Sequence, residues 1–146
     1  MFAANWEELS RRLAAVVAPQ LVPGEELVGV VYAHQAKLFS AELWAIGVTS
    51  GRLVMVPIDR RHEPSGAPLS ISRGELADCS VWGWGGGVAE FLSMTADQQI
   101  RFTAAGRKFK LMALGGNLIE DALSGPAQRR GLEALIRFLL SSRPTR

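Results

Sequence analysis

The C-terminal part of the chain carries the clearest helical pattern. Four apolar residues recur at i, i+3, i+4 and i+7 and so share one face of a helix: Leu132, Leu135, Ile136 and Leu139. Pro126 suits the first position of that helix, because proline lacks the amide hydrogen that the first turn leaves unbonded. We therefore predict an amphipathic helix over residues 126–141. Each of its four apolar residues contributes roughly 1.5–3 kcal/mol on burial.

A second amphipathic segment lies at the N-terminus. Asn5 and Glu8 have the spacing of a capping box, which predicts that a helix begins at Asn5, and Pro19 predicts its end. The apolar residues again share one face: Trp6, Leu9, Leu13, Val16 and Val17. We expect this face to pack on the domain, because Trp6 and Leu9 would otherwise be exposed. Docking of the same face on a partner is the alternative.

Between the two helices the sequence shows short extended stretches separated by turn signals. Seven strands are expected, over residues 26–34, 42–49, 52–58, 69–72, 77–84 (interrupted by glycines and resumed at 88–95), 99–104 and 107–113. Asp97-Gln98 and Ala105-Gly106 are turn signals, and residues 59–68 form a polar loop. At Ser50-Gly51, glycine would permit a positive φ in a tight turn.

The order of these elements predicts the fold class. Strands do not alternate with helices, so a parallel sheet is not expected. A sheet of short strands cannot bury its inner face alone, and the C-terminal helix is its natural cover. We predict a mainly β (α+β) fold, a bent antiparallel sheet or partly open barrel of about seven strands capped by the C-terminal helix. Residues 1–22 add an N-terminal helix packed on the domain of residues 23–146, and the whole is a single domain.

The central hairpin resembles that of a known family. Residues 44–57 bring an apolar strand to a Thr49-Ser50-Gly51-Arg52 turn, from which a second apolar strand leaves. This pattern resembles the core hairpin of bacterial pleckstrin-homology-like domains, a group close to GRAM domains. Residues 69–76 resemble the next strand and bend of that family. The resemblance covers residues 23–142 and implies a binding module or scaffold rather than an enzyme.

Two features of the hairpin region refine this expectation. Thr49 and Arg52 flank the turn, where their side chains can bond free backbone groups, so we expect them to be structural. Some pleckstrin-homology domains bind phosphorylated lipid headgroups through a basic loop between their first two strands. The corresponding residues 35–41 offer only Lys37, which departs from that pattern.

Composition narrows the class of protein further. Of 146 residues, 48% are apolar and 21% are charged, which is typical of a globular domain. The net charge of +2 is too small to predict a nucleic-acid partner. Cys79 is the single cysteine, so no internal disulfide forms, and we expect a cytoplasmic protein. No apolar run reaches the roughly 20 residues of a transmembrane helix.

Signals of catalysis are sparse. His34 and His62 have no partner at metal-ligand spacing, and neither a nucleophile elbow nor a P-loop is present. We expect no catalytic residues, no metal and no cofactor. A carboxylate pair assembled by the fold remains the alternative.

Two groups of residues are candidates for an interaction surface. Trp82 and Trp84 point to one face of a strand, either into the core or outward as an aromatic platform. The basic candidates are Arg60 and Arg61 in the polar loop, and Lys108 and Lys110, which share a strand face. Pairing across the hairpin would bring Arg101 to Lys110 and Lys108.

Three functions stay open at this point. The first is a protein-interaction or self-association module. The second is a peripheral binder of anionic membrane lipid, which would use the four basic candidates. The third is a small-molecule binding protein or enzyme of unrecognised type.

Overall fold

The computed structural model describes the backbone of residues 2–36, 41–82, 97–114 and 121–141, and the side chains of residues 8–35, 41–80, 99–113 and 130–141. Its elements, in chain order, are α1 (Phe2–Val17), η1 (Ala18–Gln20), β1 (Gly29–Ala36), β2 (Ala41–Val48), β3 (Arg52–Ile58), β4 (Leu69–Ser72), η2 (Arg73–Glu75), β5 (Ala77–Trp82), β6 (Asp97–Ala104), β7 (Arg107–Leu114) and α3 (Asp121–Ser141).

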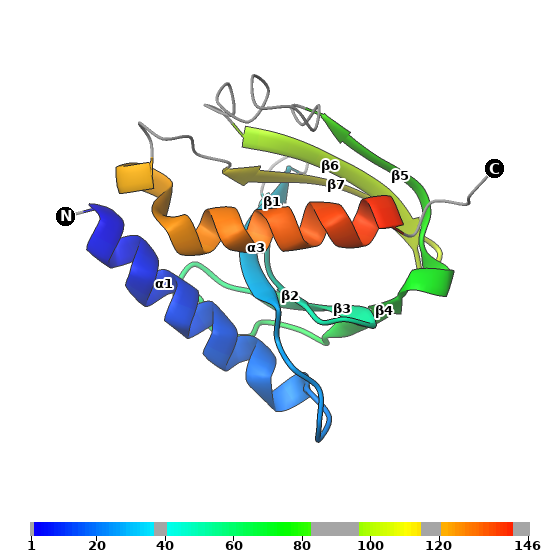
Figure 1. Ribbon diagram of the computed structural model, residues 1–146, viewed down its shortest axis with the longest axis horizontal. Coiled ribbons are helices and arrows are strands. Elements are labelled where there is room, and N and C mark those ends of the chain that lie inside the picture. Colours follow the sequence, from blue (N-terminus) through cyan, green and yellow to red (C-terminus); the bar gives the residue numbers. More distant parts are fainter. Residues whose placement is uncertain (1, 37–40, 83–96, 115–120, 142–146) are drawn as a thin grey trace.

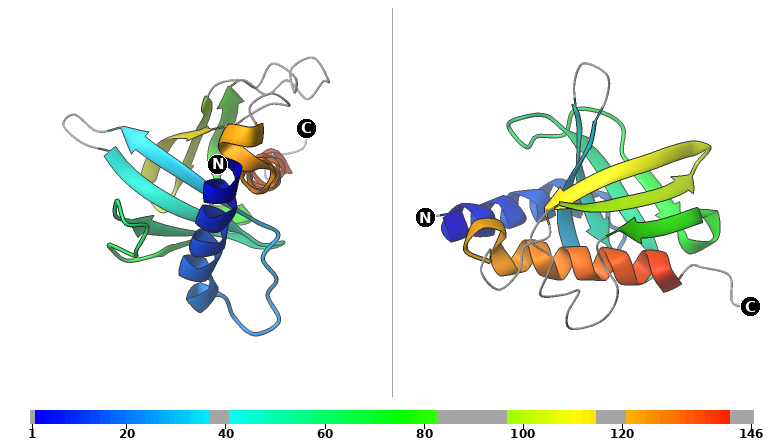
Figure 2. Two further views of the ribbon diagram at one scale, coloured as in Figure 1. Left: turned by 90° about the vertical axis from the view of Figure 1, so that its left-hand side faces the viewer. Right: turned by 90° about the horizontal axis from the view of Figure 1, so that it is seen from above.

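The seven strands form one bent sheet in the order β4-β3-β2-β1-β7-β6-β5. All neighbouring strands are antiparallel, so two meanders, β1–β4 and β5–β7, meet where β1 pairs with β7 at His34 and Met112. The two halves cross at a large angle (Figure 2), and the sheet curls around α3 (Figure 1). The predicted fold class, a bent antiparallel sheet closed by a C-terminal helix with an added N-terminal helix, is confirmed.

The main core lies between the concave face of the sheet and α3. Every residue of the predicted C-terminal stripe is buried there: Leu132, Leu135, Ile136 and Leu139. Phe102 and Phe109 stack with their ring centroids 5.0 Å apart in the same cluster. The α3 helix thus closes an interior that the curved sheet leaves open on one side.

A second core lies on the opposite face of the first meander, beneath α1. Successive residues of β3 enter different cores: Leu53 and Met55 face α3, whereas Val54 and Val56 contact α1. The uninterrupted aliphatic run of this strand is explained by burial on both faces. Leu13 and Val17 of α1 are buried against Val54 and Val56, which confirms that the N-terminal helix packs on the domain.

Glycines let both helices approach the sheet closely. A Cβ on Gly131 of α3 would lie 2.0 Å from the carbonyl oxygen of Val30 in β1. A Cβ on Gly47 of β2 would lie 2.5 Å from Cγ1 of Val17 in α1. Only glycine leaves room for the Val30 backbone at the first crossing and for the Val17 side chain at the second.

Some predicted boundaries are wrong. The first helix begins at Phe2 rather than being capped by Asn5, and α3 begins at Asp121 rather than at Pro126. Helical turns therefore precede both signals, and proline is accommodated inside a longer helix. Asp97 and Gln98 do not turn but pair with Leu114 and Ala113 in β6 and β7. The expected strand at residues 88–95 lies outside the described residues.

The β2–β3 turn differs from expectation in one respect. Among the described glycines, only Gly24 and Gly106 have positive φ, so Gly51 does not provide the predicted left-handed conformation. The turn is instead closed by Thr49, whose hydroxyl accepts the backbone N–H of Arg52 at 3.1 Å and donates to its carbonyl at 3.1 Å. The expected structural role of Thr49 is confirmed. At the β6–β7 turn, Ala105 and Gly106 both have positive φ, as a two-residue hairpin loop requires.

Within the described segments, no helix combines the length and the apolar character that crossing a membrane would need.

Candidate functional site

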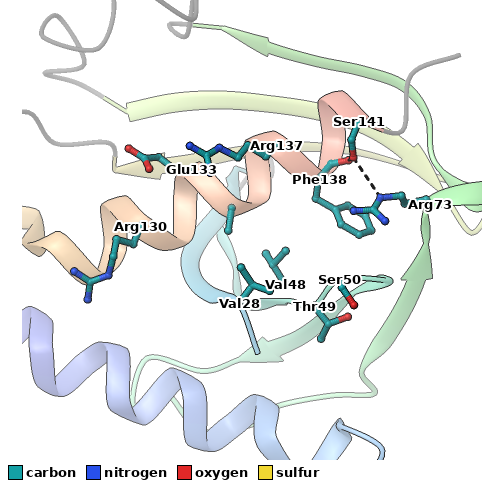
Figure 3. Close-up of a pocket in the computed structure, with 11 residues that line it drawn as sticks. Val28, Val48, Thr49, Ser50, Arg73, Arg130, Glu133, Arg137, Phe138 and Ser141 are labelled. Carbon is teal, nitrogen blue, oxygen red and sulfur yellow. Dashed lines mark hydrogen bonds between the residues drawn. The ribbon is translucent and has the colours of Figure 1, made fainter. Parts of the chain in front are cut away.

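A groove of about 450 Å³ runs between α3 and the end of the first meander. Val28 and Val48 lie at its centre, and Arg130 and Arg73 lie toward its two ends (Figure 3). The side chains of α3 that line the groove come from successive helical turns: Arg130, Glu133, Ala134, Arg137, Phe138 and Ser141. We call this feature the α3 groove.

The centre of the α3 groove exposes apolar surface. Val28 is 62% exposed, although its backbone N–H is bonded to the carbonyl of Val48 at 2.7 Å. This hydrogen bond fixes the valine just before β1 begins. Val22, the other large apolar residue exposed among the described ones, does not line the groove. Val28 is therefore an exposed apolar side chain on a backbone position that is fixed by a hydrogen bond.

Arg73, at one end of the groove, is held by two contacts. Its guanidinium lies 4.5 Å from the centre of the Phe138 ring, and its Nε donates to Ser141 Oγ at 3.3 Å. The Ser141 hydroxyl donates in turn to the carbonyl of Phe138 at 2.9 Å. Stacking on an aromatic ring orders an arginine while leaving its outer nitrogens available.

A basic face covers the outside of the β6–β7 hairpin. Arg101 lies directly opposite Lys110 and Thr103 opposite Lys108, and all three basic residues are exposed. A hollow of about 480 Å³ on this face is lined by Arg101, Lys108 and Lys110 together with Asp78, Ser80 and Thr103. The predicted convergence of Arg101 with Lys108 and Lys110 is confirmed. We call this surface the hairpin face.

Arg60 and Arg61 occupy a different place. They belong to the β3–β4 loop, where Asp59 accepts the backbone N–H groups of Arg61 and Glu63 at 2.8 and 3.1 Å. The bond from Glu63 is the main cause of a lowered pKa for Asp59. His62 of the same loop contacts Tyr32 of β1 and lines a hollow with residues of α1. The loop arginines therefore do not line the hollow that contains Lys108 and Lys110.

The aromatic candidates lie outside the described side chains. Trp82 ends β5, but its side chain is not among those described, and Trp84 falls in the undescribed segment 83–96. Neither the core nor the platform interpretation of the pair is tested. Cys79 of β5 is half-buried and packs against the main core.

An ion pair that the sequence did not reveal locks the segment after α1. Arg52 donates to both carboxylate oxygens of Glu25, at 2.7 Å each, and also to the carbonyl of Gln20 and to Ser70 Oγ. These hydrogen bonds from Arg52 are the main reason that the pKa of Glu25 falls to about 2. The network ties η1 and the segment after it to the start of β3 and to β4.

Another hollow, of about 420 Å³, lies near the β3–β4 loop, and two of the residues that line it, Glu42 and Arg107, form an ion pair. Arg107 donates to Glu42 Oε1 at 3.1 Å, as Trp44 Nε1 does at 2.9 Å, and the Arg107 guanidinium lies 4.7 Å from the Phe109 ring centre. In the described part of the chain, no three His, Cys, Asp or Glu side chains gather as a metal site would require.

Comparison with known proteins leaves the family open. No protein-family model and no curated protein matches the sequence. One solved structure similar to this chain is the C-terminal domain of an unknown protein from Leishmania infantum. It is 15% identical, the match covers 92% of this chain and 97% of that one, and the TM-score is 0.43.

Proposed function

We propose that this chain is a non-catalytic interaction module of pleckstrin-homology-like fold. It acts in the cytoplasm and holds an extended segment of a partner protein in the α3 groove. The sequence of the central hairpin, the two antiparallel meanders and the closing C-terminal helix support the family assignment. The single cysteine supports the compartment.

The exposure of Val28 inside the groove carries the proposal. Ligand pockets bury most of a small molecule's surface, whereas this groove is open to solvent beside a helix. An extended chain can lie along such a surface and cover the valine with one apolar side chain. Because Val28 is fixed by its bond to Val48, the bound conformation requires no rearrangement there.

The test selects ligands from a display library of short random peptides and measures their affinity by fluorescence anisotropy. Val28→Ser should weaken binding about tenfold, since covering a valine contributes about 1.5 kcal/mol. Val22→Ser is the matched control, because Val22 is 58% exposed and lies outside the groove. Equal affinities for the two variants would overturn the proposal. Self-association broken by Val28→Ser would show that a second copy, not a peptide partner, fills the groove.

The hairpin face favours a second candidate function, contact with an anionic membrane surface. Like charges directly opposite each other destabilise a sheet, yet Arg101 faces Lys110 and Lys108 is nearby. Each basic residue near an anionic surface contributes about 1 kcal/mol. Sedimentation with phosphatidylserine vesicles tests this function. Binding at low salt that disappears in Lys108→Gln/Lys110→Gln, but persists in Arg60→Gln/Arg61→Gln, supports it, and no binding at low salt contradicts it.

A further inference from the structure

We propose that the α3 groove selects acidic segments and that Arg73 receives their carboxylate. This inference rests on the function proposed above and adds the chemistry of the partner: an extended peptide in which an Asp or Glu accompanies the apolar residue over Val28.

The charges around the groove point to an anionic ligand. Three arginines line it, Arg73, Arg130 and Arg137, against one carboxylate, that of Glu133. Arg130, Glu133 and Arg137 belong to one helical face, at i, i+3 and i+7, so Arg130 and Arg137 border the same opening. Among the described residues, neither Arg130 nor Arg137 has an ion-pair partner. Their field attracts an acidic chain and repels a basic one.

Arg73 differs from the other two because it is already ordered. Phe138 lies under its guanidinium plane and Ser141 accepts from its Nε. In the described part of the chain, its two terminal nitrogens have no hydrogen-bond partner. A planar guanidinium held in this way can donate two parallel hydrogen bonds to a carboxylate with little loss of side-chain entropy.

The position of Arg73 fixes the register of the ligand. Figure 3 shows Arg73 beside Phe138 and Ser141 at one end of the groove, with Val28 and Val48 between it and Arg130. A peptide that places its acidic residue at Arg73 brings a neighbouring side chain over the valines. The acidic and apolar residues are therefore recognised together.

The experiment uses the peptides selected on the full chain, each made in two forms that differ only by Asp→Asn or Glu→Gln. Wild-type protein should bind the acidic form at least tenfold more tightly, because hydrogen bonds to charged groups are the stronger ones. Arg73→Gln should remove this preference, and Arg73→Lys should restore only part of it, since lysine lacks the planar pair of donors. Arg61→Gln, in the distant loop, is the matched control and should retain the preference.

The outcomes separate the two proposals. Peptides whose binding depends on Val28, but which bind equally in the acidic and amide forms, would overturn this inference and leave the protein-binding function standing. A preference that survives Arg73→Gln would also overturn it. If no selected peptide is sensitive to Val28→Ser, the proposed function fails and the inference fails with it. Circular dichroism checks that Arg73→Gln is folded. If Arg73→Gln does not fold, the partial loss of the acidic preference in Arg73→Lys provides the test instead.

Discussion

Substituting Gly131 by alanine sets two physical effects against each other. Gly131 lies inside α3, and alanine is favoured over glycine in a helix by about 1 kcal/mol. Helix propensity alone therefore predicts a more stable protein. The structure predicts the opposite, because the added Cβ would lie 2.0 Å from the carbonyl oxygen and 2.7 Å from the carbonyl carbon of Val30.

The size of the effect follows from what must move. The atoms that the Cβ meets belong to the backbone of β1, which no side-chain rotation can displace. Relief requires α3 to withdraw by about 1 Å, which loosens the packing of Leu132 and Leu135 on the sheet. Overpacking of this kind costs about 1–3 kcal/mol and occasionally more. Because backbone atoms must move, we expect a cost at the upper end of this range. Subtracting the helix-propensity gain of about 1 kcal/mol leaves a net loss of about 2 kcal/mol in the free energy of unfolding, or roughly 4–8 °C in Tm.

Urea unfolding followed by circular dichroism measures this change. Gly51→Ala is the matched control, because an added Cβ there meets nothing within 4 Å and the φ angle is not positive. It should be neutral or stabilise the protein by up to about 1 kcal/mol. Gly29→Ala acts on the same crossing, since its Cβ would lie 2.9 Å from Gly131 Cα, so the two losses should not add. A Gly131→Ala protein more stable than wild type would refute the close crossing of α3 over β1.

Three further predictions concern the core, the Glu25–Arg52 ion pair and the hairpin face. Leu135→Ala should lower the free energy of unfolding by about 2–5 kcal/mol in urea titration, whereas a change below 1 kcal/mol would show that α3 does not close the core. Glu25→Gln should lower Tm at neutral pH, because it breaks the ion pair with Arg52. The pKa of Glu25 is about 2 in the folded protein, below its ordinary value. The stabilisation by this pair is therefore complete above about pH 5 and is lost as the pH falls toward 2. The Tm difference between Glu25→Gln and wild type should therefore shrink on acidification, and a difference independent of pH would contradict the ion pair. Arg101→Gln should leave Tm unchanged or raise it slightly by relieving repulsion from Lys110, and a marked fall in Tm would show that Arg101 is structural.

The parts of the fold that local pattern determines were predicted well. The strand over residues 52–58 has the expected bounds because its aliphatic run is buried on both faces and is interrupted by turns at each end. The α3 stripe and the packing of α1 follow from helical periodicity. Both predicted helix starts are wrong. A proline or a capping residue is compatible with the first turn of a helix, but it does not force the helix to begin there.

The candidate site was harder to predict because it is assembled from distant segments. The pairing of Arg101 with Lys110 followed from the hairpin alone. The α3 groove is lined by residues from Val28, the turn after β2, Arg73 and α3. No local sequence pattern predicts where a helix crosses a sheet. Glu25 carries no sequence signal as the partner of Arg52, which lies 27 residues away.

A map of peptide contacts on the backbone tests the central claim most directly. An acidic peptide selected on the full chain would be titrated into isotopically labelled protein, and amide chemical shifts recorded. We predict that the shifts concentrate at Val28, at Val48 to Ser50, at Arg73 and along α3 from Arg130 to Ser141. Shifts confined to the hairpin face, with the α3 groove silent, would contradict the proposal.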